Sequence, residues 1–325
     1  MRERLAALAA RAAQEGGPGV VLAVDAPVLA VRERLGAGGL VADAPIRIAS
    51  VTKTVTALTA LRLAEEGRLS LDEPLEGPWE DVTLRQCLAH RAGLPDVFGR
   101  LLEIERRGEA AGRGRPWEPG RMLELVADAP RPTRGAFRYS DTGYVLAGLA
   151  IERAAEAPLH EAYRRMVLDP LGMHATHLEG REPPRGPDPA TPWAPDLDCG
   201  AIDPTIDWGG GGLVSTVDDL ARLVRGLHDG RLIGAATLAQ MTATVPTGDG
   251  AIGRMEAYGL GLGRWRAGNE SLIGHGGVWG AFAYLWPEGD AVLAGSVNRM
   301  GPLGAAATEL LDGVVEALAA ARRAR

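Results

Sequence analysis

The chain of 325 residues is 46% hydrophobic and 24% charged, which is the composition of a globular protein with a sizeable core. Its formal net charge is −7 and its arginines are scattered among acids, which argues against nucleic acid as a partner. No apolar run is long enough to cross a bilayer, and the N-terminus lacks the apolar core of a signal peptide, so we expect a cytoplasmic protein without a membrane partner.

Strand patterns begin near the N-terminus. Residues 2–15 are expected to form a helix, 19–36 two short strands around an Ala-Pro turn, and 45–50 a short extended segment. From 52 to 66 apolar residues recur at helical spacing, and Gly67 ends this helix.

The middle of the chain, roughly 70–240, contains helical patterns separated by loops rich in Gly and Pro. Residues 179–198 are too rich in proline for a helix or a central strand and are expected to form a long ordered loop. Between 258 and 299, runs of strand length alternate with Gly, Pro and Asn, and a last helix is expected over 303–323.

This order of elements predicts an α+β fold, with an antiparallel sheet built from both chain ends and flanked by the terminal helices. A mostly helical lobe is inserted into it. We predict that residues 1–66 and 205–325 form the α/β lobe and that residues 67–204 form the helical lobe.

The segment IASVTKTVTAL contains the single lysine of the chain, Lys53, three residues after Ser50. Positions i and i+3 share a helix face, so the amine is expected beside the serine hydroxyl at a helix N-terminus. A serine needs a neighbouring base to act as a nucleophile, and a desolvated lysine, unlike an arginine, can supply one. The helix N-terminus also offers N–H groups to a carbonyl oxygen. The alternative is that Lys53 is a surface residue left in an arginine-rich chain.

The segment FRYSDTGYVLAG contains Tyr139 and Asp141. A tyrosine close to a lysine cation can have its phenol pKa lowered, and it can then relay the proton of the serine to a leaving group. The alternative is that Tyr139 is an amphipathic core residue at the junction of a loop and a helix.

The segment GHGGVWG contains His275, Gly276, Gly277 and Val278. Glycines after a strand let a backbone approach a ligand closely, so the N–H of Val278 is a candidate oxyanion donor opposite that of Ser50. The alternative is a glycine-rich strand edge with a hydrogen-bonded histidine.

The three segments, in this order, resemble the S-x-x-K, Y-x-N and H-x-G motifs of the serine beta-lactamase and penicillin-binding-protein superfamily. Within it they resemble the class C beta-lactamase-related esterases, D-aminopeptidases and DD-carboxypeptidases. The segments VTLRQCLAHRAGLPD, VLDPLGMHATHL and WGGGGLVSTVDDLARL add to the likeness, which extends over about residues 15–300. The resemblance implies that Ser50 is the nucleophile, Lys53 and Tyr139 handle protons, and the N–H groups of Ser50 and Val278 form the oxyanion hole.

Two positions depart from the family pattern. Asp141 stands where the family has asparagine, and a carboxylate accepts hydrogen bonds but donates none. It could hold Lys53 as a cation, which would favour Tyr139 as the general base, and the choice between the two bases stays open. His275 replaces a lysine that holds a substrate carboxylate, and a neutral imidazole gives no fixed positive anchor. Both departures favour neutral esters, or amides without the penicillin carboxylate.

The expected function is therefore that of a serine hydrolase that forms an acyl-enzyme on Ser50, an esterase or a related hydrolase of small ester or amide substrates. The alternatives are a D-amino-acid peptidase or DD-carboxypeptidase, a weak beta-lactamase, and, in another class, a non-catalytic binding or scaffold relative. The chemistry needs only side chains and backbone N–H groups, so no metal or organic cofactor is expected.

Three further groups of residues need an interpretation. Cys87 and Cys199 form no metal or redox motif. His174 and His177 lack a third ligand and are interpreted as structural. Four tryptophans fall near the motifs, where some would line an acyl pocket and at least half would lie in the core: Trp208, Trp265, Trp279 and Trp286.

Overall fold

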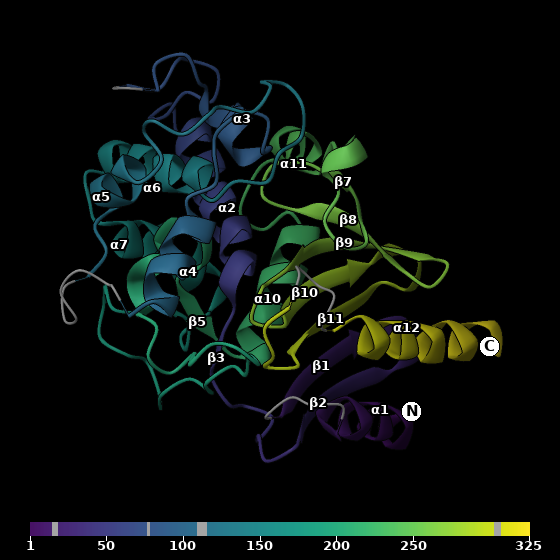
Figure 1. The fold of residues 1–325 in the computed structure, drawn as a ribbon. Coiled ribbons are helices and arrows are strands. Elements are labelled where there is room, and N and C mark those ends of the chain that lie inside the picture. Colours follow the sequence, from purple (N-terminus) through teal and green to yellow (C-terminus); the bar gives the residue numbers. More distant parts are fainter. Residues whose placement is uncertain (15–18, 77–78, 109–115, 302–306) are drawn as a thin grey trace.

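The computed structural model describes residues 1–14, 19–76, 79–108, 116–301 and 307–325, and the structural statements below concern these residues. Strands from both ends of the chain form one antiparallel sheet (Figure 1). Its order is β2 (Val31–Ala37), β1 (Val20–Ala26), β11 (Ala291–Ser296), β10 (Ala281–Trp286), β9 (Glu270–Gly276), β8 (Gly263–Ala267), β7 (Met255–Tyr258) and β6 (Val245–Pro246). The N-terminal strand β1 pairs directly with the C-terminal strand β11. The predicted sheet built from both chain ends is confirmed.

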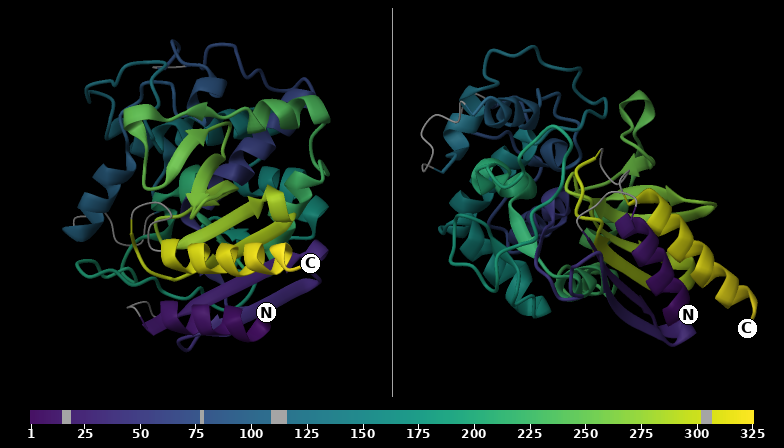
Figure 2. Two further views of the ribbon diagram at one scale, coloured as in Figure 1. Left: turned by 90° about the vertical axis from the view of Figure 1, so that its right-hand side faces the viewer. Right: turned by 60° about the horizontal axis from the view of Figure 1, so that its bottom comes forward.

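The terminal helices α1 (Arg2–Gln14) and α12 (Thr308–Arg323) lie side by side on one face of this sheet (Figure 2). Strand β1 is buried on both faces, and its residues divide between two cores with the period of two that a strand requires. Val20, Leu22 and Val24 join the core under the terminal helices, whereas Val21 and Ala23 join the core on the opposite side.

The helical part of the molecule lies against that opposite face (Figure 1). There α10 (Val217–His228) packs on β1, β10 and β11. The other helices are α2 (Thr52–Glu65), α3 (Leu84–Leu88), α4 (Phe98–Arg106), α5 (Pro119–Glu124), α6 (Thr142–Ala155), α7 (Leu159–Tyr163), α8 (Asp169–Leu171), α9 (Trp208–Gly211) and α11 (Ala235–Thr242). A small antiparallel sheet joins β3 (Ile46–Arg47), β5 (Leu213–Ser215) and β4 (His177–Leu178).

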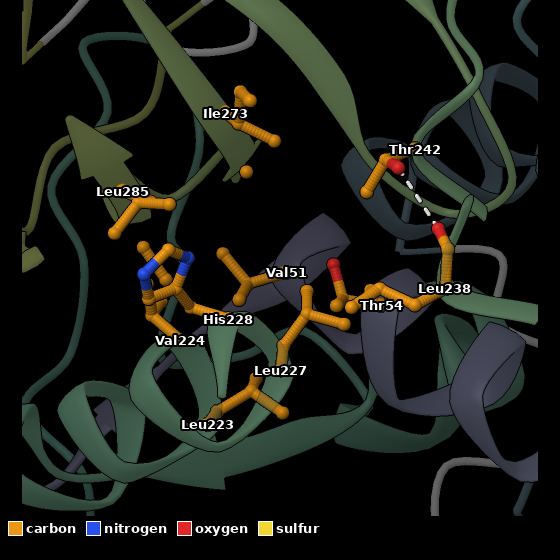
Figure 3. Close-up of a pocket in the computed structure, with 12 residues that line it drawn as sticks. Val51, Thr54, Leu223, Val224, Leu227, His228, Leu238, Thr242, Ile273 and Leu285 are labelled. Carbon is orange, nitrogen blue, oxygen red and sulfur yellow. Dashed lines mark hydrogen bonds between the residues drawn. The ribbon is translucent and has the colours of Figure 1, made fainter. Parts of the chain in front are cut away.

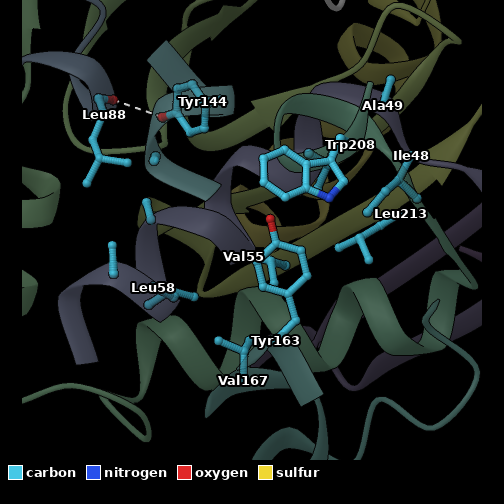
Figure 4. Close-up of a cluster of buried hydrophobic side chains, with 14 of the residues drawn as sticks. Ile48, Ala49, Val55, Leu58, Leu88, Tyr144, Tyr163, Val167, Trp208 and Leu213 are labelled. Atoms are coloured by element: carbon cyan, nitrogen blue, oxygen red, sulfur yellow. Dashed lines mark hydrogen bonds between the residues drawn. The ribbon is translucent and has the colours of Figure 1, made fainter. Parts of the chain in front are cut away.

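Helix α2 runs through the centre of the larger core, and its residues from Thr52 to Leu61 are all buried. Figure 4 shows Val55 of this helix among the side chains of Tyr144, Tyr163 and Trp208. A helix with no exposed face must satisfy its polar side chains internally. It does so through threonines.

Two of those threonines fix α2 to neighbouring segments, one to the loop at Gly261 and one to helix α9. The hydroxyl of Thr54 donates to the carbonyl oxygen of Gly261 at 2.7 Å, and that of Thr56 donates to the carbonyl oxygen of Gly209 at 2.7 Å. Each hydrogen bond joins residues that are more than 150 positions apart in the sequence. The helix that carries the conspicuous lysine is therefore held rigidly in place.

Most of the expected elements are observed. The first helix and the two strands after it occur where expected, and the helix after Ser50 ends at Glu65, with Gly67 at a φ of +69° just beyond it. Residues 179–198 form a loop without helix or strand, tied to the sheet end by the N–H of Trp193, which donates to the oxygen of Asn298 at 3.0 Å.

Some expectations remain open. The start of the last helix, expected at 303, lies outside the described residues, and the helix is observed over Thr308–Arg323. The division into two lobes at 66/67 and 204/205 stays a prediction. Within the described part of the chain, no helix has the length and apolar character that a membrane span needs.

Candidate active site

The site begins at a strained turn between β3 and α2. Ala49 has a φ of +44°, a left-handed conformation that an alanine adopts only when the surrounding structure imposes it. This turn places Ser50 at the head of the helix, with 8% of its surface exposed. One turn further on lies Lys53, which is completely buried. The amine Nζ of Lys53 lies 2.9 Å from Oγ of Ser50, so the structure brings the two residues into direct contact.

Three acceptors surround the amine of Lys53. It donates to Oγ of Ser50, to the carboxylate Oδ1 of Asp141 at 2.5 Å and to the carbonyl oxygen of Gly210 at 2.7 Å. An ammonium has three N–H donors, so this arrangement satisfies a charged lysine completely. The alternative interpretation of Lys53 as a surface residue is wrong, because Lys53 is completely buried. Lys53 and Asp141 lie in the ion-pair contact that the sequence analysis suggested.

Gly210 is a member of this network that the sequence analysis did not single out. A Cβ atom at this position would lie 2.4 Å from Oδ1 of Asp141 and 3.5 Å from Nζ of Lys53. Its carbonyl also supplies one of the three acceptors. The run of four glycines at 209–212 was a visible signal, because glycine allows close approach of a backbone to buried groups.

Tyr139 lies over the same amine, with Nζ of Lys53 4.9 Å from its ring centroid. Its hydroxyl is buried and has no hydrogen-bond partner within the described residues. Burial and the negative charge of Asp141 raise its pKa well above the usual range, and the approach of the Ser50 hydroxyl lowers the pKa only partly. The pKa of Tyr139 thus moves opposite to the lowering expected from the sequence, mainly because burial disfavours the phenolate and secondarily because of the charge of Asp141. Tyr139 is a neutral phenol that can donate a proton.

His90 holds Tyr139 in position and was not singled out from the sequence. Its ring stacks on that of Tyr139 with centroids 4.0 Å apart. Its Nδ1 accepts a hydrogen bond from the N–H of Ser140 at 3.2 Å, and its carbonyl oxygen accepts one from the N–H of Arg138 at 2.8 Å. The histidine thus binds the backbone on both sides of Tyr139. Its place in the family-like segment LAHRAGLP was the available signal.

His275, at the end of β9, is neutral. Its Nδ1 donates to the carbonyl oxygen of Gly276 at 2.7 Å, so its Nε2 accepts from the hydroxyl of Tyr258 at 2.9 Å. Burial and the positive charge of Lys53 lower the pKa of His275 to about 3. As expected from the sequence, no positive anchor for a substrate carboxylate stands at this position.

The turn after β9 lies against the start of α2. A Cβ atom at Gly277 would lie 2.5 Å from the carbonyl oxygen of Ile48, so only a glycine allows this approach. The next residue, Val278, has its carbonyl bonded by the N–H of Gly301 at 2.9 Å, while its own N–H has no acceptor in the part of the chain that the structure describes. This free N–H beside the turn that carries Ser50 suits the predicted oxyanion donor.

Asp207 is a second acid near the site that sequence reasoning missed. Burial, together with the charge of Asp141, raises its pKa to about 7, and the attraction of Lys53 only partly offsets this. Asp207 lines a small pocket together with Trp279, the residue after Val278. A second buried carboxyl group therefore lies near the Lys53–Asp141 pair.

The remaining residues singled out from the sequence are mostly buried. The four tryptophans are all buried, in agreement with a mainly core role. His177 is buried in β4 and His174 is exposed, and the described residues contain no group of three or more potential metal ligands. Both cysteines are buried and unpaired.

The chain is similar in sequence to several curated proteins. Among curated proteins, the chain is 34% identical to esterase EstB of Burkholderia gladioli over 161 residues, which cover 44% of this chain and 41% of the esterase. It is 27% identical to penicillin-binding protein 4* of Bacillus subtilis (strain 168) over 174 residues, which cover 50% of this chain and 38% of that protein. The matches thus span about two fifths of each relative.

Solved structures match over nearly the whole chain. A D-stereospecific amidohydrolase from Streptomyces sp. superimposes with a TM-score of 0.82 and 27% identity, covering 95% of this chain and 97% of that one. D-amino acid amidase from Ochrobactrum anthropi SV3 gives a TM-score of 0.85 at 23% identity, covering 99% and 100%, and shows the fold alone. The family model described as Beta-lactamase matches residues 6–315. The chain therefore belongs to the beta-lactamase family and is a serine hydrolase of that family.

Proposed function

We propose that the protein hydrolyses small neutral esters, and related amides, through an acyl-enzyme on Ser50. The observation that carries this proposal is the contact between Ser50 and a buried lysine that is itself bonded to Asp141. A serine hydroxyl is a weak nucleophile unless a neighbouring group takes its proton. In this chain Lys53 and Asp141, which are hydrogen-bonded to each other, form the route by which the proton of Ser50 can leave.

The proposed acylation step uses these two acceptors together. As Oγ of Ser50 attacks the acyl carbon, its proton moves to Nζ of Lys53, and a proton of Lys53 moves across the 2.5 Å contact to Asp141. The lysine is an ammonium before and after the step, and the negative charge of Asp141 passes to the oxyanion. The N–H groups of Ser50 and Val278 stabilise that oxyanion.

Collapse of the oxyanion breaks the bond to the leaving group. The leaving oxygen or nitrogen takes a proton from the neutral phenol of Tyr139, and Tyr139 recovers a proton from Lys53, which is then reprotonated from Asp141. Water then attacks the acyl-enzyme by the same route and releases the acid. In this sequence Tyr139 starts as a protonated phenol, and its raised pKa keeps the phenol protonated until the leaving group takes the proton.

The charges of the site support neutral substrates. His275 is uncharged, so a substrate carboxylate would find no fixed cation there. Asp141 is paired with Lys53, so a net negative charge here would come from Asp207 in its ionised form, whose pKa is raised to about 7. A penicillin carboxylate would be repelled, whereas an ester without a charge would not.

The second candidate is a D-amino-acid amidase. The same negative charge that disfavours an anionic substrate would attract an ammonium group, and the D-stereospecific amidohydrolase matches over 95% of the chain. D-phenylalanine amide carries an ammonium and no carboxylate, which suits both features.

A panel of acyl donors tests these candidates. Initial rates with p-nitrophenyl acetate, D-phenylalanine amide and nitrocefin would be compared, with intact-mass detection of one acyl group per chain. We expect the ester to react fastest and nitrocefin slowest. We expect Ser50→Ala to lose activity by at least about 1,000-fold and to form no adduct, whereas Ser70→Ala, outside the site, keeps both.

The outcomes separate the candidates. Faster turnover of the D-amide than of the ester would favour the amidase. Efficient nitrocefin turnover with poor ester hydrolysis, or an adduct on a residue other than Ser50, would contradict the proposal.

A further inference from the structure

A second, apolar pocket lies behind the helix that carries the nucleophile (Figure 3). It has a volume of about 200 Å³ and is lined by residues of α10, α11, β9 and β10, together with Val51 of the turn before α2 and Thr54 of α2. Val51 directly follows Ser50 in the sequence, and Thr54 directly follows Lys53. Neither Ser50 nor Lys53 lines the pocket. It is therefore separate from the candidate active site.

The walls of this back pocket are hydrocarbon. Leu223, Val224 and Leu227 enter from α10, and Ile273 and Leu285 enter from the sheet. Figure 3 shows these side chains pointing toward a common space. None of the twelve lining residues is an aspartate, glutamate, lysine or arginine.

The two threonines in the lining have already used their donors. The hydroxyl of Thr54 donates to Gly261, and that of Thr242 donates to the carbonyl oxygen of Leu238 at 2.8 Å. His228 stands at the solvent-exposed rim, with Nε2 3.7 Å from Oδ1 of Asp290. A buried water needs two to four polar partners, and the inner part of the pocket offers few.

We propose that this back pocket binds a small, uncharged, apolar molecule of about the size of one or two aromatic rings. An apolar protein cavity of about 150 Å³ stays free of water and binds benzene. The volume of the back pocket, about 200 Å³, therefore suits a ligand of that class. A charged ligand would be buried without a partner, which is strongly unfavourable.

Titration with p-fluorotoluene, followed by ¹⁹F NMR, tests the site directly. We expect saturable binding with a Kd on the order of 0.1 to 1 mM, the range for a ligand with so few atoms. The half-buried Leu238 of α11 lines the pocket, so Leu238→Trp fills it and should weaken binding at least 10-fold. The matched control is Ala236→Trp on the exposed side of the same helix, which should bind as the wild type does.

A second variant covers the case in which Leu238→Trp does not fold. Leu227→Trp fills the pocket from α10 on the opposite wall and should also weaken binding at least 10-fold, with far-UV circular dichroism confirming the fold of each variant. Absence of saturable binding to the wild type would overturn the proposal. Binding that is equal in the wild type and in a folded pocket-filling variant would overturn it too, because the probe would then lie elsewhere.

Discussion

The contact between Lys53 and Asp141 can be measured by a double-mutant cycle. The two side chains are 0% and 14% exposed, and Nζ and Oδ1 are 2.5 Å apart. Lys53→Met removes the charge and keeps most of the chain length, and Asp141→Leu removes the carboxylate with little change in volume. Each single variant leaves one charge buried without its partner, whereas the double variant removes both charges.

The burial sets the size of the effect. Breaking a buried ion pair by removing one partner costs about 3–5 kcal/mol, while replacing both partners with apolar groups is often close to neutral. The single variants should therefore each lose about 3 kcal/mol in the free energy of unfolding, and the double variant clearly less than their sum. The expected coupling energy is at least about 2 kcal/mol. With about 2.1 cal/mol/K of unfolding entropy per residue, 3 kcal/mol is about 4 °C in Tm.

Urea unfolding followed by circular dichroism measures the four free energies at one pH. The matched control is the cycle Arg153→Met with Glu76→Leu, because that ion pair has a similar separation of 2.8 Å but is 56% and 84% exposed. An exposed pair should couple by less than about 1 kcal/mol. The reasoning fails if the Lys53–Asp141 coupling is as small as that of the control, or if the double variant loses the full sum of the single losses.

Three further predictions concern the surroundings of that pair. Gly210→Ala should lower kcat/KM by at least about 10-fold, because its Cβ would lie 2.4 Å from Oδ1 of Asp141; Gly120→Ala, with no neighbouring atom within 4 Å, should not. His275→Gln should leave the shape of the pH profile of kcat unchanged between pH 5 and 8, because a pKa of about 3 keeps the imidazole neutral over that range. A change of kcat with pH near 6.5 that is present in the wild type and absent in the variant would contradict this. The pKa of Asp207 is about 7 in the folded protein, against a usual value of 3.8, so the folded state binds a proton that the unfolded state has lost between these two pH values. The free energy of unfolding should therefore fall as the pH rises from about 4 to about 7. Asp207→Asn should flatten this slope in urea titrations, and an unchanged slope would refute the prediction.

The sequence determined the features that depend on local geometry. The order of strands and helices predicted the sheet from both chain ends, because the periods of two and of 3.6 residues are visible in one dimension. The contact of Ser50 with Lys53 followed from a spacing of three residues on a helix. The neutral state of His275 followed from its residue type and was strengthened by burial.

The tertiary structure decided what depends on distant contacts. The family-like motif suggested Asp141 as a partner of Lys53, whereas Gly210 reaches Lys53 from 157 residues away and no pattern near Lys53 reveals it. The pKa of Tyr139 moves opposite to the expectation, because burial disfavours the charged phenolate and the nearby charge of Asp141 adds to this effect. The contacts of His90 with the Tyr139 segment and the apolar pocket behind α2 arise only when separate elements pack together. Burial and electrostatic fields are properties of the packed molecule, which is why the residue types alone could not fix them.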